Sequence, residues 1–233
     1  MADPISLSGL AVALLLPWVL GSVWVQVLLC RAKSRHPAII LGHGYLVGLF
    51  LTTVFLRIWG TLNLPLTFWP ITGVLFTSCL AGVLAIRLLS SERLDSQPYS
   101  SDEKAETWQR VVIGIFLVLI AQRLGTLGQE LALRPLIAWD AWMNWAPRAI
   151  VWFESGSIFP FVSPDHWLKL PAGPHTLNTW DYPPTIPLIQ LWTMLGIQTS
   201  DHSLIYLPWL LILIAMCLAL FGHLRLLGCS TLA

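Results

Sequence analysis

The sequence predicts an all-α protein: a polytopic transmembrane helix bundle with an external loop that carries an interfacial amphipathic helix. Hydrophobic residues make up 56% of the 233 residues and charged residues only 11%, whereas about 25% of the residues in an ordinary soluble domain are charged. Long apolar stretches also alternate with short polar ones, which is typical of spanning helices joined by loops. The net charge of +1 gives no electrostatic reason to expect nucleic acid as a partner. The expected surrounding is the lipid bilayer.

Six apolar stretches are candidate membrane spans. Most of them have about 20 residues, enough to cross about 30 Å of hydrocarbon. In chain order they are 7–29, 38–59, 68–89, 111–131, 183–197 and 204–224. The fifth stretch is the shortest of them.

Basic residues predict how these spans are oriented. They gather in the first polar loop and in or beside the third: Arg31, Lys33, Arg35, Arg87, Arg93, Lys104 and Arg110. The positive-inside rule places both loops in the cytoplasm. The N-terminus and residues 134–182 are then extracytoplasmic. The polar linker near residues 90–109 divides the chain into an N-terminal three-span membrane unit with a cytoplasmic linker (1–107) and a second unit (108–233).

The segment 134–182 holds six of the thirteen tryptophans, a residue that concentrates where bilayer meets water. Positions 139, 142, 145, 149, 152 and 153 recur at spacings of three or four and form one apolar stripe of a helix. Asp140, Asn144 and Arg148 recur every four residues on a different face. We expect a helix that lies flat in the interface, with its tryptophans in contact with lipid or the bundle and this polar face turned away from lipid. Pro147 must kink the helix or mark a second start.

Two motifs in this segment resemble a known family. Trp-Asp-Ala-Trp at Trp139–Trp142 leads into Arg148-Ala149, and Trp-Asp-Tyr-Pro-Pro follows at Trp180–Pro184. Together with the outward span before them and the variable loop between them, they resemble the GT-C superfamily of membrane glycosyltransferases. The nearest branch is the bacterial group of lipopolysaccharide-core glycosyltransferases and protein mannosyltransferases. The resemblance covers about residues 108–228, which corresponds to the N-terminal part of such an enzyme only.

The resemblance implies transfer of a sugar from a polyprenyl-phosphate donor to an extracytoplasmic acceptor, in the bacterial inner membrane. It implies Asp140 as the general base or acceptor-orienting carboxylate, because a carboxylate can take the proton of an attacking hydroxyl. Asp181 is the second catalytic candidate. No cofactor is implied, and no Asp-x-Asp or Glu-x-Asp pair occurs in the segment, so we expect no metal.

The phosphate of the donor leaves as an anion and needs a cation beside it. Arg148 is the strongest substrate-binding candidate, because a guanidinium can donate to two phosphate oxygens at once. Lys169 and His175 are the other cationic candidates in the loop. Asn144, on the same helical face as Asp140, completes the set of expected substrate-binding residues.

Each of these residues also has a structural interpretation. Asp140 could cap a helix N-terminus or pair with Arg148. Asp181 precedes a Pro-Pro turn, where aspartate is common for backbone reasons alone. Lys169 and His175 could be ordinary solvated side chains. An enzymatic role therefore follows from the resemblance and not from any one residue.

An alternative function is open as well: a non-catalytic transmembrane subunit of a larger membrane complex, which binds partner membrane subunits, lipids or pigments. The chain is short for the superfamily, and a partner chain could complete the scaffold. His43 lies in Gly-His-Gly-Tyr and is either a hydrogen-bonded packing residue or a ligand for a flat pigment. Arg123 and Glu130 fall seven residues apart near the outer end of the fourth span, where long side chains reach water.

Overall fold

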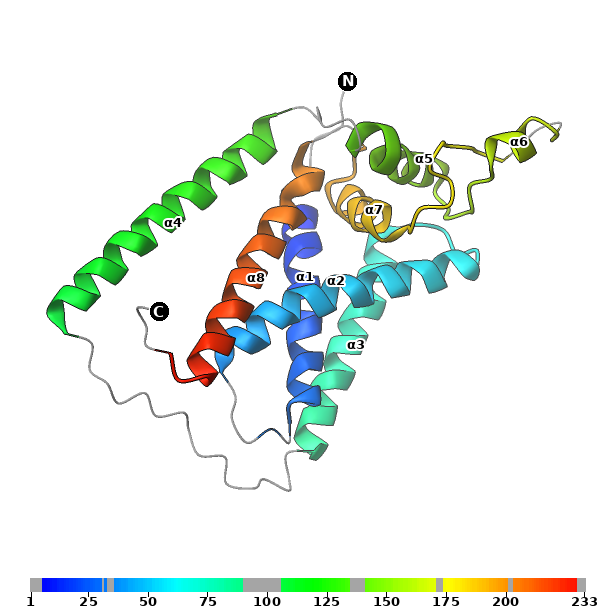
Figure 1. Ribbon diagram of the computed structural model, residues 1–233. Coiled ribbons are helices and arrows are strands. Elements are labelled where there is room, and N and C mark those ends of the chain that lie inside the picture. The colour runs from blue at the N-terminus through cyan, green and yellow to red at the C-terminus, as the bar shows by residue number, and fades with distance from the viewer. Residues whose placement is uncertain are drawn as a thin grey trace.

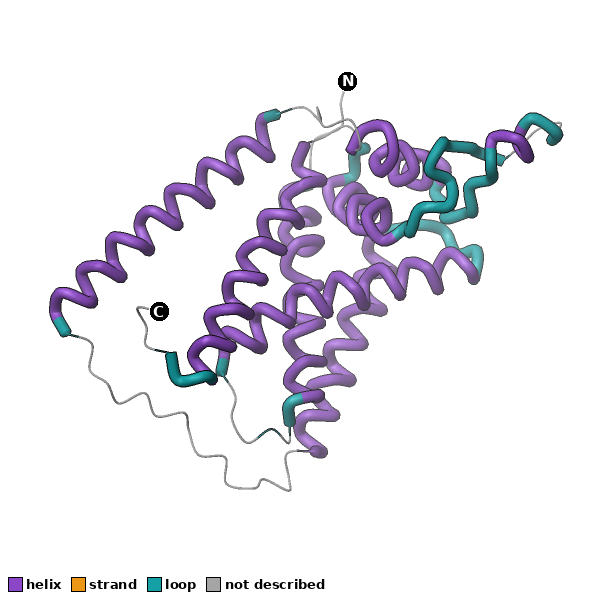
Figure 2. The backbone as a smooth tube through the Cα atoms, viewed as in Figure 1, coloured by secondary structure: helices purple, strands orange, loops and turns teal. Residues whose placement is uncertain are grey.

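The predicted all-α class is confirmed. The computed structural model describes residues 6–30, 32, 36–89, 106–134, 141–170, 174–200 and 203–229. Within these residues the regular elements are helices, apart from an isolated bridge between Val162 and Thr176 (Figure 2). In chain order the helices are α1 (Leu7–Leu28), α2 (Pro37–Thr61), α3 (Phe68–Leu89), α4 (Thr107–Leu133), η2 (Ala141–Trp145), α5 (Ala146–Ser155), α6 (Pro164–Trp167), α7 (Thr185–Ile197), η3 (Ser203–Tyr206) and α8 (Leu207–Leu226).

Five of these helices are long and apolar enough to cross a membrane, so the chain is a multi-pass membrane protein. They are α1, α2, α3, α4 and the combined segment Ser203–Leu226. In Figure 1, α5, α6 and α7 gather at one end of the bundle that α1, α2, α3 and α8 form.

Helix α7 corrects the expected fifth span. It has 13 residues, which rise about 20 Å and fall short of the roughly 30 Å of hydrocarbon. The helix starts directly after Pro183-Pro184 and ends at Gln198, which has a left-handed φ of 62°. All residues of Pro187–Ile197 are buried within the protein. The apolar run that looked like a lipid-facing span is therefore the centre of the protein core.

Small residues let the long helices approach closely. A Cβ on Gly21 would collide with the carbonyl oxygen of Gly44, and a Cβ on Gly48 would collide with that of Pro17, so α1 and α2 touch backbone to backbone. Gly42 of α2 lies equally close to the backbone of Ala215 in α8. In a bilayer the hydrophobic effect does not favour helix–helix contact over helix–lipid contact, because both are apolar. Helices associate there through close van der Waals packing, which small residues allow.

Helix α7 is tied to α1 by packing and by a buried hydrogen bond. The indole Nε1 of Trp192 donates to the carbonyl oxygen of Ala13 at 2.8 Å, and the Trp192 side chain is 1% exposed. Gly9 and Gly196 meet at the same crossing, where a Cβ on either would strike the other's backbone. This crossing places the start of α7, and the turn that precedes it, at the end of the bundle occupied by α5.

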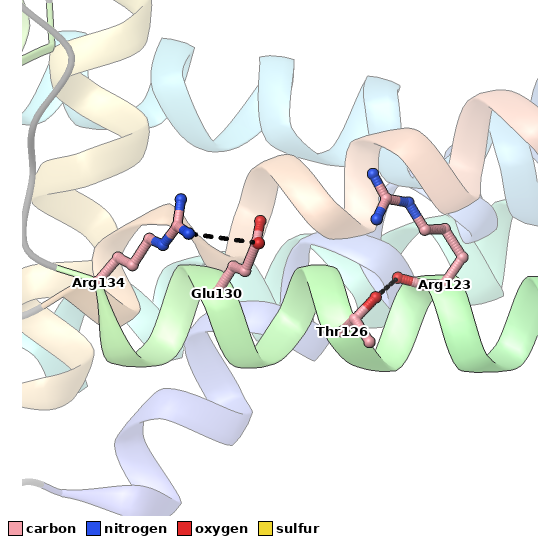
Figure 3. Close-up of polar contacts among 4 residues, drawn as sticks. All are labelled: Arg123, Thr126, Glu130 and Arg134. Atoms are coloured by element: carbon pink, nitrogen blue, oxygen red, sulfur yellow. Dashed lines mark hydrogen bonds and ion pairs between the residues drawn. The ribbon is translucent and has the colours of Figure 1, made fainter.

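Helix α4 stands apart from the other helices (Figure 1). None of its residues is buried, and it contacts η3 and α8 near its C-terminal end, where Ser203 donates to the carbonyl oxygen of Ala132. Figure 3 shows Arg123, Thr126 and Glu130 of this helix together with Arg134, which directly follows it. Glu130 pairs with Arg134 at 3.7 Å, whereas Arg123 contributes its carbonyl oxygen to Thr126. The Glu130 and Arg134 side chains are more than half exposed, so the pair contributes little to stability.

The α1–α2 crossing gives a first testable prediction. Gly48→Ala should destabilise the protein by about 1–3 kcal/mol, because the new methyl group must displace the Pro17 carbonyl. Gly73→Ala on α3 is the matched control, since a Cβ there meets no atom within 4 Å. That control should be neutral or slightly stabilising, because alanine favours helices over glycine. The midpoint of unfolding by sodium dodecyl sulfate in mixed micelles measures both variants, and equal midpoints would contradict the packing described above.

Candidate functional site

The described part of the predicted amphipathic helix begins with η2, a π-helical turn, and continues into α5. Pro147 lies in the first turn of α5, where a missing backbone N–H breaks no hydrogen bond. The expected kink at Pro147 therefore takes the form of a π-turn that ends just before it, and such turns often mark functional sites. Trp139 and Asp140 lie outside the described residues.

Two residues of the apolar stripe pack against protein, in agreement with the expectation that its tryptophans contact lipid or the bundle. Ala149 is 0% exposed and Trp152 is 3% exposed, and α5 contacts α7 along this face. The indole Nε1 of Trp152 donates to the carbonyl oxygen of Phe159 at 2.8 Å. The buried part of α7 offers an apolar surface to α5. The loop after α5 supplies the carbonyl of Phe159 as a hydrogen-bond acceptor for the Trp152 indole, which lipid chains cannot do.

Arg148 connects α5 to the turn before α7. Its guanidinium donates from Nη1 to the carbonyl oxygen of Tyr182 at 2.8 Å and from Nη2 to that of Thr179 at 2.5 Å. The ring of Trp145 lies 5.5 Å from the ring of Tyr182. These contacts join the helical segment that follows Trp-Asp-Ala-Trp to the Trp-Asp-Tyr-Pro-Pro turn, across the whole of α6 and its flanking loops.

The electrostatics of Arg148 follow from its burial. The side chain is 3% exposed, and desolvation lowers the pKa of its guanidinium, while the charge of nearby Asp181 raises it again. The Nε atom is buried and has no hydrogen-bond acceptor among the described residues. The ring of Phe161 lies 5.3 Å from Cζ, within range of a cation–π contact. The cation is thus held by two carbonyls and one ring, with the Nε donor unused.

The other predicted site residues lie at different distances from this centre. Asn144 is half-buried in η2, one turn before Arg148, and Asp181 is exposed in the turn that Arg148 holds. His175 is exposed and stacks on Phe159, with ring centroids 5.1 Å apart. Lys169 is exposed just after α6, which projects away from the bundle in Figure 1. The structure therefore gathers Asn144, Arg148 and Asp181 and leaves Lys169 apart.

A cavity of about 570 Å³ opens beside Arg148. A second arginine, Arg57, lines it from the C-terminal part of α2, and five aromatic residues are among the other lining residues. These residues are Trp152, Phe159, Phe161, Trp180 and Tyr182. Sequence reasoning missed Arg57, although a lone charge inside a candidate span is itself a signal of function.

Two further arrangements bear on metal and pigment binding. Within the described ranges, no group of three or more His, Cys, Asp or Glu side chains gathers in one place. His43 of α2 has its Nε2 atom 2.9 Å from Nε2 of His223 in α8. This is a hydrogen-bonded contact between two packed helices, as in the packing interpretation of His43.

No family model matches the chain, and neither the curated proteins nor the solved structures contain a match to it. The resemblance to GT-C glycosyltransferases therefore rests on the two motifs and their order.

Proposed function

We propose that the chain is a membrane glycosyltransferase, or the N-terminal portion of one, that transfers a sugar from a polyprenyl-phosphate donor to an extracytoplasmic acceptor. The supporting observation is the pair of hydrogen bonds from Arg148 to Thr179 and Tyr182. They hold the Trp-Asp-Tyr-Pro-Pro turn against the helix that follows Trp-Asp-Ala-Trp. The helix that follows the first motif and the turn that contains the second thus lie beside one cavity, which supports a shared site.

The chemistry assigned to these residues is simple. An acceptor hydroxyl attacks the anomeric carbon of the donor, the bond from that carbon to the phosphate oxygen breaks, and polyprenyl phosphate leaves as an anion. Asp140 takes the proton of the hydroxyl as the new bond forms. Arg148 already donates from two of its nitrogens to backbone carbonyls. Its role is to hold the turn and to supply positive charge with its free Nε, rather than to clamp phosphate with both Nη atoms.

This function requires that residues 134–182 face outward from the bacterial inner membrane, as the basic loops predict. In a variant whose native Cys30, Cys79, Cys217 and Cys229 are replaced, Ser163→Cys should react with a membrane-impermeant maleimide in intact spheroplasts. Ser101→Cys, in the polar linker, should react only after the membrane is permeabilised. The reverse pattern would contradict this orientation and, with it, an extracytoplasmic acceptor.

Donor binding can be tested without knowing the acceptor. A polyprenyl-phosphate sugar that carries a photoreactive group on its first isoprene unit should label peptides from α5 and from the turn at 179–184. Excess unlabelled donor should suppress that labelling, and polyprenol without phosphate should not. Labelling spread over α3 and α4, or labelling that unlabelled donor leaves unchanged, would count against a donor site at this place.

A second function is favoured by one observation: none of the residues of α4 is buried. Its exposed residues include large apolar side chains on all sides: Val111, Ile115, Phe116, Leu117, Val118, Leu119 and Ile120. A helix with this surface suits a non-catalytic subunit whose neighbours in a larger membrane complex cover α4. That function predicts no release of polyprenyl phosphate, together with a particle in native mass spectrometry that is heavier than the chain and contains a second polypeptide in fixed ratio.

A further inference from the structure

The cavity beside Arg148 is built jointly by the N-terminal helices and the loop between α4 and α7. We call it the two-arginine cavity, after Arg57 of α2 and Arg148 of α5, which both line it. The two parts are in direct contact at its edge. A Cβ on Gly60 of α2 would strike Ile158, and the backbone N–H of Leu66 donates to the carbonyl oxygen of Gly156 at 2.9 Å. The position of Arg57 opposite α5 is therefore fixed by packing.

The two-arginine cavity carries positive charge that the described protein does not neutralise. No hydrogen bond or ion pair joins Arg57 to any described residue. None of the lining residues is acidic. Asp181 acts on Arg148 through its charge, but it is exposed in the turn outside the lining. An anion entering the cavity would thus meet two cations and no carboxylate in its walls.

The Nε–H of Arg148 is a buried hydrogen-bond donor that indicates what kind of group a ligand would offer. Arg148 is 97% buried, and its Nε–H has no acceptor among the described residues. Buried polar groups are nearly always hydrogen-bonded in native proteins, so this N–H of a residue that lines the cavity calls for an acceptor from elsewhere. Arg57, whose side chain is exposed and unpaired, can swing toward the same acceptor. A phosphate group offers oxygens to both guanidinium groups at once.

The walls and the position of the cavity suggest what carries the phosphate. Phe159, Phe161, Trp180 and Tyr182 present flat apolar surfaces to the cavity. Arg57 lies four residues before the end of a membrane-spanning helix, at the depth where a long cationic side chain reaches the headgroup level. Charged residues within spans commonly mark binding sites for this reason.

We propose that the two-arginine cavity binds the phosphate group of a membrane lipid, with Arg57 and Arg148 facing the phosphate and the aromatic walls facing the adjoining apolar part. This site rests on the proposed sugar transfer, because Arg148 faces the donor's phosphate there too, and it adds Arg57 to the phosphate-binding groups. It uses a helix outside the part of the chain that resembles glycosyltransferases, and it requires no catalytic step.

Equilibrium binding of radiolabelled short-chain phosphatidic acid to the protein in dodecyl maltoside micelles, which contain no phosphate, tests the proposal. Binding to wild type should be saturable, and Arg57→Gln should weaken it about tenfold or more, since a charge-assisted hydrogen bond is lost. Arg123→Gln is the matched control, because Arg123 is also an exposed arginine on a span but lies on α4, away from the cavity (Figure 3). Its binding should equal that of wild type. Trp180→Ala should weaken lipid binding by removing part of the wall.

The competing ligands distinguish the sources of the phosphate. Short-chain diacylglycerol, which lacks phosphate, should not compete. Inorganic phosphate should compete only weakly, and equal competition by it would support an anion site filled from solution. Equal binding by wild type and Arg57→Gln, or competition by diacylglycerol as strong as by phosphatidic acid, would overturn the proposal. Saturable lipid binding in a protein that releases no polyprenyl phosphate would leave this site standing and remove the proposed sugar transfer.

Discussion

Asp140→Asn should lower the rate of sugar transfer by about 10²–10⁴-fold, the usual contribution of a general base. The amide keeps the shape of the carboxylate but offers no basic oxygen to accept the proton of the acceptor hydroxyl. Donor binding should stay largely unchanged, because the proton moves only in the transition state. Single-turnover release of polyprenyl phosphate from a labelled donor measures the rate, and photolabelling by the same donor measures binding.

Asp181→Asn is the informative comparison for Asp140→Asn. Asp181 is exposed in the turn that Arg148 holds, and its charge raises the pKa of the Arg148 guanidinium. Because Asp181 acts on the charge of Arg148 and takes no proton from the acceptor, loss of its carboxylate should reduce the rate of sugar transfer less than loss of the Asp140 carboxylate. Equal release rates for wild type and Asp140→Asn would remove Asp140 from the mechanism, and a larger effect of Asp181→Asn would exchange the roles of the two residues.

Arg148→Met should destabilise the protein and release the turn before α7. Methionine fills a similar volume but leaves the carbonyls of Thr179 and Tyr182 without their donor, and each unsatisfied buried group costs about 1–3 kcal/mol. Loss of the guanidinium also removes a buried cation, so photolabelling by the donor should weaken. The midpoint of unfolding in mixed micelles and limited proteolysis near 174–184 measure the two effects.

The control for Arg148→Met is Arg123→Met, which removes an exposed arginine from α4. It should leave both the unfolding midpoint and the proteolysis pattern of wild type unchanged. Arg148→Lys should fall between them, because a single ammonium cannot reach two carbonyls with the geometry of a planar guanidinium. An unfolding midpoint of Arg148→Met equal to that of wild type would show that the turn is held by other contacts.

The long helices could be predicted from the sequence because one physical requirement determines them. A span must be apolar over the thickness of the bilayer, and the stretch 68–89 matches α3 residue for residue. Helix α7 shows where this reasoning ends. Its apolar run satisfies the same composition rule, but hydropathy does not distinguish a helix surrounded by lipid from one surrounded by protein. Only the prolines before it and the left-handed Gln198 after it limit its length.

The site was predictable in its sequence motifs and not in its contacts. Periodicity separated Arg148 from the apolar stripe of Ala149 and Trp152, yet the structure buries all three. Periodicity assigns residues to faces of one helix, and it carries no information on what covers each face. Arg57 was missed for a related reason. Its place in the cavity depends on the packing of α2 against the end of α5, a contact between segments far apart in sequence.

Release of polyprenyl phosphate is the most direct test of the proposed transfer of sugar from a polyprenyl-phosphate donor. The purified protein, with any chain that copurifies in fixed ratio, is placed in nanodiscs with a panel of radiolabelled polyprenyl-phosphate hexoses and a membrane extract as acceptor. We predict that wild type releases polyprenyl phosphate from at least one donor, that the release depends on the acceptor, and that Asp140→Asn abolishes it. No release by wild type from any donor in the panel would contradict the account and favour the non-catalytic membrane subunit.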